Sequence, residues 1–309
     1  MKRVMVTGAG GFIGVNLCRV LNERGIYIYA VLRSTDSYTE ELRAMDHMIP
    51  VICNLDEAHK LAGMIAGTSK DSSIDTVYHL AWDGVSGNKR SDYKMQLKNI
   101  DNTLELIKAV QKLGCRRFVG VGSTAECDAY NASVADGVCP DPVRIYGTSK
   151  MAAHFMSKII CNASGMEHVW AMIGNTYGVG DRSNNFVNFS LKLILSDAEA
   201  RFTSGEQNQD FIYITDVAEA LYCLGEKGRD KCGYYIGSGS PGKLKEYIIT
   251  IRNTINPEKE LKLGAVPYHG VSADIESFSI EKIKNDTGFE PGVKFEEGIV
   301  RTAEWLRKM

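Results

Sequence analysis

The chain has 309 residues, 44% hydrophobic and 24% charged, which is ordinary for a globular protein and enough for a large α/β domain with a smaller lobe. Its formal net charge of -2 gives no reason to expect nucleic acid or an acidic membrane surface as a partner. Eight cysteines are spread singly, without a C-x-x-C or Cys/His cluster, so zinc and disulfide frameworks are not expected. No apolar run approaches the roughly 18 residues that span a bilayer, and no signal peptide precedes the first strand, so we expect a soluble, cytoplasmic protein.

The first stretch of the chain combines an apolar strand, a glycine-rich turn and a helix. Residues 4–6 form an apolar run, apolar residues recur at helical spacing from Ile13 to Leu21, and Gly25 stands where that helix would end. Glycines let the backbone come close to a bound group, and a helix N-terminus favours an anion such as a pyrophosphate. The turn therefore predicts a dinucleotide site, although such turns also serve as plain connectors. Its predicted cofactor-binding residues are Gly8, Gly11, Phe12, Ile13 and Gly14.

The end of the second predicted strand, residues 26–32, bears on which dinucleotide binds. An acidic residue there would hold the ribose 2′-OH of NAD, whereas an arginine would accommodate the 2′-phosphate of NADP. The acidic position is vacant and Arg33 follows the strand, which favours NADP with NAD still possible; the alternative is a solvated arginine. A third strand at residues 50–53 leads to Asn54 and Leu55, where an adenine ring could rest.

Strands continue to alternate with helices up to residue 124. A fourth strand at residues 75–80 ends in Leu80 and Ala81, which would face the cofactor, and a long helix is predicted over residues 93–113. A fifth strand at residues 117–121 runs into Thr124. This alternation predicts an α/β fold, a Rossmann doubly wound parallel sheet with helices on both faces. Ligands bind such sheets at the carboxyl ends of the strands, where all of these candidate residues fall.

The second half of the chain is less regular. Residues 127–145 include two prolines and predict a loop, followed by a helix from Tyr146 to near Gly165 and a sixth strand at residues 169–173. Further helices are predicted over residues 186–195, 216–224, 244–255, 281–287 and 295–306, with a strand at residues 234–236. We expect residues 1–174 to form the dinucleotide-binding Rossmann domain, with segments near 206–238 returning to it. Residues 175–309 then form mainly a smaller, interleaved C-terminal lobe for substrate.

Tyr146 and Lys150 suggest the chemistry. They lie four residues apart, on one face of the predicted helix. A free tyrosine has a pKa of about 10, and a neighbouring ammonium lowers it, so the pair predicts a proton donor or acceptor for a carbonyl/alcohol couple. Thr124 can donate a second hydrogen bond to the same substrate oxygen. Such a pair also occurs by chance in helices, and only together with the glycine turn does it favour catalysis.

With these residues in place, the sequence resembles the extended short-chain dehydrogenases/reductases, the NAD(P)-dependent nucleotide-sugar epimerases, dehydratases and reductases. The resemblance covers nearly the whole chain, and the G-x-x-G-x-x-G spacing of the glycine turn is the form this family uses. It implies that Thr124, Tyr146 and Lys150 are catalytic, that Tyr146 and Lys150 also contact the cofactor, and that Asn175 touches substrate. It also implies a homodimer formed through the helices that begin near Tyr93 and Tyr146. The motifs that carry it are residues 7–14, His79-Leu80-Ala81, Asn99, Asn175-Thr176-Tyr177-Gly178, residues 209–217, Phe289-Glu290-Pro291 and Trp305.

Departures from the family pattern narrow the reaction. In the dehydratases the threonine is followed by Asp and Glu, but here Ala125 and Glu126 follow, so the acid is missing and dehydration is not expected. Gln209 stands where the family's arginine grips the nucleotide phosphates, which weakens the case for a standard nucleotide diphosphate sugar or means that another cation takes over. Trp82-Asp83-Gly84 would line the sugar end and could select among hexoses. The predicted substrate-binding residues are Trp82, Thr124, Glu126 and Asn175.

The leading hypothesis is an NADPH-dependent reductase of a nucleotide-linked 4-keto-(6-deoxy)hexose. A nucleotide-sugar C4 epimerase with retained NAD is the close alternative. A non-catalytic dinucleotide sensor is the alternative of another class, and it is disfavoured because a sensor has no use for Thr124, Tyr146 and Lys150.

Overall fold

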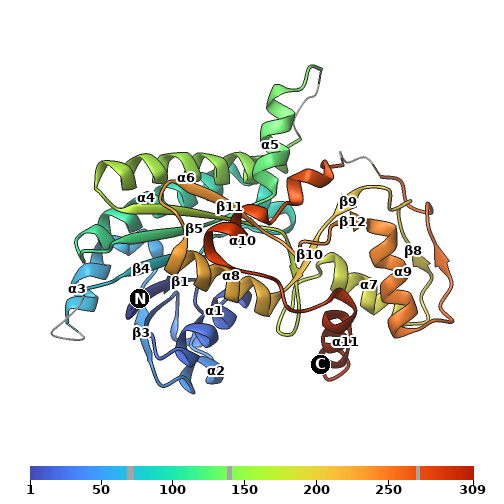
Figure 1. Cartoon of the computed structure of the whole chain (residues 1–309), viewed down its shortest axis with the longest axis horizontal. Coiled ribbons are helices and arrows are strands. Elements are labelled where there is room, and N and C mark those ends of the chain that lie inside the picture. Colours follow the sequence, from blue (N-terminus) through green and yellow to red (C-terminus); the bar gives the residue numbers. More distant parts are fainter. Residues whose placement is uncertain (68–72, 138–140, 269–271) are drawn as a thin grey trace. The chain divides into compact units, whose positions relative to one another are not determined.

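A seven-stranded sheet organises the first half of the molecule. The computed structural model describes residues 1–67, 73–137, 141–268 and 272–309 (Figure 1). The strand order is β11-β6-β5-β4-β1-β2-β3, and the pairings from β6 to β3 are parallel. The strands are β1 (Arg3–Thr7), β2 (Tyr27–Leu32), β3 (Met48–Ile52), β4 (Thr76–His79), β5 (Arg117–Ser123), β6 (Glu167–Ile173) and β11 (Cys232–Ile236). The predicted Rossmann-type parallel sheet is confirmed.

Helices cover both faces of this sheet. Side chains of α3 (Leu61–Ala66), α4 (Tyr93–Gln111) and α6 (Arg144–Ala163) share one buried apolar core with alternate residues of the strands. On the other face lie α1 (Phe12–Glu23) and α8 (Ile214–Lys227), and the short α2 (Glu40–Arg43) follows β2 (Figure 1). Asp92 caps α4, because its carboxylate accepts from the N–H groups of Lys94 and Met95, each at 3.1 Å.

The described chain divides into two compact units. The first comprises Met1–Ile173, Ala218–Tyr234 and Ile283–Phe289, and the second comprises Gly174–Val217, Tyr235–Lys282 and Glu290–Met309. Within the second unit, three short strand pairs join β7 to β10, β9 to β12 and β8 to β13. The strands are β7 (Asn175–Tyr177), β8 (Ala200–Arg201), β9 (Asn208–Gln209), β10 (Phe211–Tyr213), β12 (Gly242–Lys243) and β13 (Leu261–Lys262). The later helices are α7 (Phe186–Leu195), α9 (Leu244–Ile255), α10 (Glu281–Thr287) and α11 (Phe295–Leu306).

In the first unit, the predicted loop over residues 127–145 is partly wrong. Residues 127–134 of the expected loop belong to a helix, α5 (Ala125–Val134), and α6 begins at Arg144, two positions before the predicted start. The sequence of α5 has no apolar stripe, so its periodicity gave no signal; the helix is anchored by the buried small residues Ala129 and Ala132. Val138, Cys139 and Pro140 of the expected loop lie outside the described residues. Among the described helices, none is long and apolar enough to span a bilayer.

Candidate active site

The turn between β1 and α1 forms a tight glycine cradle. Gly8 has a φ of +70°, and a Cβ there would lie 2.9 Å from the Ala81 nitrogen. A Cβ on Gly14 would overlap the Gly8 carbonyl oxygen. Gly11 begins α1 without a side-chain cap, and the first turn of the helix carries no acidic residue. A backbone that only glycine allows, beside uncapped N–H groups, fits the pyrophosphate of a dinucleotide.

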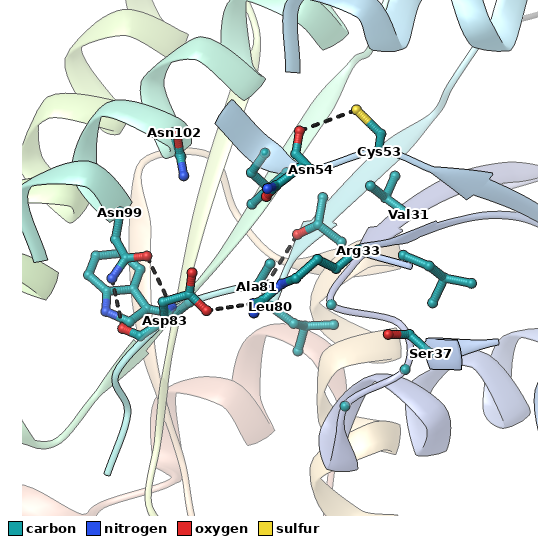
Figure 2. Close-up of a pocket in the computed structure, with 17 residues that line it drawn as sticks. Val31, Arg33, Ser37, Cys53, Asn54, Leu80, Ala81, Asp83, Asn99 and Asn102 are labelled. Carbon is teal, nitrogen blue, oxygen red and sulfur yellow. Dashed lines mark hydrogen bonds and ion pairs between the residues drawn. The ribbon is translucent and has the colours of Figure 1, made fainter. Parts of the chain in front are cut away.

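A cavity of about 340 Å³ opens beside this cradle at the carboxyl ends of β1, β2, β3 and β4 (Figure 2). Its volume lies in the range of small-molecule sites. Most of the predicted cofactor-binding residues line it: Gly8, Gly11, Arg33, Asn54, Leu55, Leu80 and Ala81, together with the predicted sugar contact Trp82. The other predicted cofactor contacts are outside this lining: Phe12, Ile13, Gly14, Tyr146 and Lys150. Asp83, expected at the sugar end, also lines the cavity. The sequence did not single out the other lining residues as cofactor contacts: Thr7, Gly10, Val31, Leu32, Ser37, Cys53, Asn99 and Asn102.

Lys150 lies deep in the first unit, 4% exposed. Its Nζ donates to the Val121 carbonyl at 2.8 Å and lies 3.8 Å from the centre of the Trp82 ring. Burial lowers the pKa of Lys150 to about 7, and the Glu126 carboxylate acts in the opposite direction. The lysine is therefore held between its charged and neutral forms near physiological pH.

Tyr146 is also buried, and its surroundings differ from the expectation. Burial raises the pKa of Tyr146; a hydrogen bond with the Ser123 hydroxyl and the Arg90 guanidinium act to lower it, without cancelling the effect of burial. The Arg90 guanidinium carbon lies 4.6 Å from the ring centre. The prediction that Lys150 lowers the pKa of Tyr146 is wrong for this arrangement, because burial dominates and the cation that acts on the phenol is Arg90.

Ser123 and Arg90 are thus neighbours of Tyr146 that sequence reasoning missed. Ser123 precedes the predicted Thr124, and it is the Ser123 hydroxyl that bonds the phenol. Thr124 begins α5 and is half-buried, and its carbonyl accepts from the Cys127 N–H at 3.0 Å. Ser123 could have been predicted, because it is a second hydroxyl at the end of β5 next to Thr124. No pattern in the sequence indicates that Arg90 contacts Tyr146.

Glu126, predicted to contact substrate, is 5% exposed and fully engaged by its own chain. Its carboxylate accepts from the Ser123 N–H at 3.0 Å and from the Trp170 indole N–H at 3.2 Å. His154 Nδ1 lies 3.3 Å from the other carboxylate oxygen. A carboxylate with three partners is held in place by its own chain.

Asn175, the remaining substrate candidate, belongs to the second unit. Its amide nitrogen donates to the Gln209 side-chain oxygen at 2.7 Å and to the Asp210 carbonyl at 3.2 Å. Gln209, which replaces the family's arginine, is therefore paired directly with Asn175 of β7. The pair presents amide groups with no net charge.

A parallel Rossmann sheet, a glycine cradle and a buried tyrosine–lysine pair together define an NAD(P)-dependent enzyme of the short-chain dehydrogenase type. Residues 4–237 match the model of the NAD dependent epimerase/dehydratase family, and the chain belongs to that family. The resemblance seen in the sequence is confirmed.

Individual relatives are distant but match along the whole chain. CDP-abequose synthase of Salmonella typhimurium is 24% identical over 305 residues, covering 96% of this chain and 95% of the relative. The dTDP-4-dehydro-6-deoxy-D-allose reductase of Streptomyces bikiniensis is 25% identical over 329 residues, covering 99% and 96%. The crystal structure of UDP-glucose 4-epimerase from Thermotoga maritima, with UDP-glucose, has a TM-score of 0.79 at 22% identity and 99% coverage of both chains. That likeness shows a shared fold.

Proposed function

We propose that this protein is an NADPH-dependent reductase of a nucleotide-linked 4-keto-(6-deoxy)hexose. The observation that carries the proposal is Arg33, which lines the cofactor cavity at the end of β2, where an acidic residue would favour NAD. Beside it stands the buried phenol of Tyr146, whose pKa is raised by burial. A protonated phenol is the form that delivers a proton to a carbonyl oxygen as the carbonyl is reduced. Oxidation of an alcohol, the first half-reaction of an epimerase, needs the opposite form.

The chain's own residues divide the work of reduction. When bound, the reduced nicotinamide supplies the hydride. Tyr146 gives its proton to the developing alkoxide, and the hydroxyls of Thr124 and Ser123 hold the substrate oxygen and the phenol in line. Lys150, in its ammonium form, binds the cofactor ribose and supports the phenolate left after proton transfer. The glycine cradle and Arg33 hold the two ends of the ADP moiety.

The residues that follow Thr124 favour a reductase or an epimerase over a dehydratase. In dehydration, two side chains beside the threonine must protonate a hydroxyl and remove a carbon-bound proton. Here Ala125 has no acidic group, and the Glu126 carboxylate is committed to Ser123, His154 and Trp170. The relative named as a dTDP-4-dehydro-6-deoxy-D-allose reductase acts on the proposed substrate class.

The test is to incubate the protein with NADPH and a panel of 4-keto-6-deoxy sugar nucleotides while following loss of reduced cofactor. We expect oxidation of NADPH with at least one of them, and a loss of about 10²- to 10⁴-fold in rate for Tyr146→Phe with cofactor binding retained. Interconversion of 4-hydroxy pairs by protein that retains NAD, without added cofactor, would establish the C4 epimerase instead; the family description names NAD and epimerases. If the protein binds cofactor but turns over no sugar nucleotide, and Tyr146→Phe binds cofactor equally well, the protein is a non-catalytic dinucleotide sensor.

The proposal extends to assembly and compartment. On α4 and α6, large apolar side chains are exposed, among them Leu97 at 58%, Phe155 at 56% and Ile159 at 68%. Such a patch supports a homodimer formed through these two helices. The described cysteines are free thiols, which suits the reducing cytoplasm. Light scattering of the purified protein measures whether it is a dimer, and cell fractionation measures whether it is cytoplasmic.

A further inference from the structure

We propose that Asp83 sets how strongly the protein prefers NADP, because its carboxylate competes with the 2′-phosphate for Arg33. The inference rests on the proposed function, in which Arg33 receives that phosphate. It adds a specificity-determining residue from a different strand end, one that the sequence did not single out for this purpose.

The two side chains meet across the cofactor cavity. Arg33 follows β2 and Asp83 follows β4, and both line the cavity. The Arg33 Nη2 atom lies 2.5 Å from Asp83 Oδ1, and Figure 2 shows the two side chains extended toward one another. The Arg33 guanidinium, predicted to bind the 2′-phosphate of NADP, is therefore already paired with the Asp83 carboxylate.

Hydrogen bonds from α4 fix the backbone of Asp83, and this places its carboxylate at the cavity. Asn99 of α4 accepts from the Asp83 N–H at 3.0 Å and donates to its carbonyl at 2.8 Å. Gln96, one turn earlier, donates to the Gly84 carbonyl at 3.2 Å. Both amide side chains are buried, whereas the Asp83 side chain is 49% exposed. The loop therefore holds the backbone of Asp83 in place and leaves its carboxylate at the cavity, where it pairs with Arg33.

Cofactor binding would act on this pair unequally. A phosphate monoester carries about -1.5 to -2 charges at neutral pH, so a 2′-phosphate at Arg33 must displace Asp83 and then lie near its charge. A ribose 2′-OH carries no charge and can donate a hydrogen bond to a carboxylate. Asp83 therefore weakens NADPH binding and leaves NADH binding unchanged or slightly stronger. The ratio of NADPH affinity to NADH affinity should therefore be smaller with Asp83 present than it would be with Arg33 and no carboxylate beside it.

The experiment compares dissociation constants for NADPH and NADH, measured by calorimetry at low salt, in wild type, Asp83→Asn and Arg33→Ala. Asparagine keeps the size of the side chain, and we expect Asp83→Asn to tighten NADPH binding by about fivefold, the upper range for an exposed ion pair. NADH affinity should stay within about twofold, which also reports a folded cavity. The gain should shrink at high salt, because the interaction is between exposed charges.

Asp56→Asn is the matched control. Asp56 forms a comparable exposed ion pair with Lys98, and the cavity lining does not include it. An equal gain in NADPH affinity for Asp56→Asn, or none for Asp83→Asn, overturns the role of Asp83 while the reductase proposal stands. If Arg33→Ala leaves NADPH affinity unchanged, the NADP preference in the proposed function is refuted, and this role of Asp83 falls with it.

Discussion

Replacing Glu126 by glutamine removes one buried charge from the active site while keeping the shape of the side chain. The amide oxygen can still accept from the Ser123 N–H and the Trp170 indole, and the amide nitrogen can donate to His154. The fold should therefore survive the change. What disappears is the negative charge that opposes the effect of burial on Lys150.

The size of the effect follows from the charges involved. Burial places the pKa of Lys150 at about 7 with Glu126 in its charged form. At an effective dielectric constant near 20, two unit charges interact by about 4 kcal/mol at about 4 Å and by about 2 kcal/mol once they are well beyond ion-pair distance. Because one pKa unit corresponds to about 1.4 kcal/mol, we expect the pKa of Lys150 in the Glu126→Gln variant to fall by about 1 to 1.5 units. At pH 7 the charged fraction would drop from about half to a tenth or less.

NADPH affinity measured by calorimetry between pH 5 and 9 reports this change, since the ammonium form of Lys150 is proposed to bind the cofactor ribose. In the wild type, affinity should weaken as the pH rises through about 7, where Lys150 loses its proton. In Glu126→Gln the same weakening should occur about one pH unit lower. Glu105→Gln removes an exposed carboxylate of α4 and should leave the profile in place. A Glu126→Gln profile that coincides with the wild type, or moves to higher pH, refutes the reasoning.

Three further changes test other parts of the site. Gly14→Ala places a Cβ over a backbone carbonyl of its own loop, so NADPH affinity should fall by about tenfold or more, whereas Gly63→Ala, where the added atom meets nothing within 4 Å, should bind normally. Arg90→Gln removes the cation 4.6 Å from the Tyr146 ring and should raise the pKa of that phenol, moving the alkaline loss of reductase activity to higher pH; a move to lower pH contradicts the assignment. Ile159→Lys places a charge on the exposed apolar face of α6 and should give a monomer by light scattering; a dimer of unchanged affinity would exclude this face.

The sheet could be predicted because its strands are short apolar runs that need no neighbours to be recognised. Residues 26–32 form such a run, and Tyr27–Leu32 is a buried strand of the sheet. The helix α5 could not be predicted, since its ten residues carry no apolar stripe and its burial depends on packing against α6. Local pattern thus sufficed where an element is apolar by itself, and failed where tertiary contact decides.

The site shows the same division. The glycine turn and the Tyr146–Lys150 spacing are local, and the sequence showed both. The Arg33–Asp83 pair joins residues fifty positions apart, and the Arg90–Tyr146 contact joins a turn after β4 to α6. The pKa of Tyr146 depends on how much of the side chain the fold buries, which residue spacing does not report.

Two tryptophans stand beside ionisable side chains of the candidate site, Lys150 and Glu126. The Trp82 ring lies 3.8 Å from the Lys150 ammonium and lines the cofactor cavity, and the Trp170 indole donates to the Glu126 carboxylate. Because indole emission responds to charges next to the ring, Trp82 gives the protein its own optical reporter of protonation at Lys150. Loss of the Lys150 proton, or arrival of a nicotinamide cofactor, should be visible as a change in intrinsic fluorescence without any attached label.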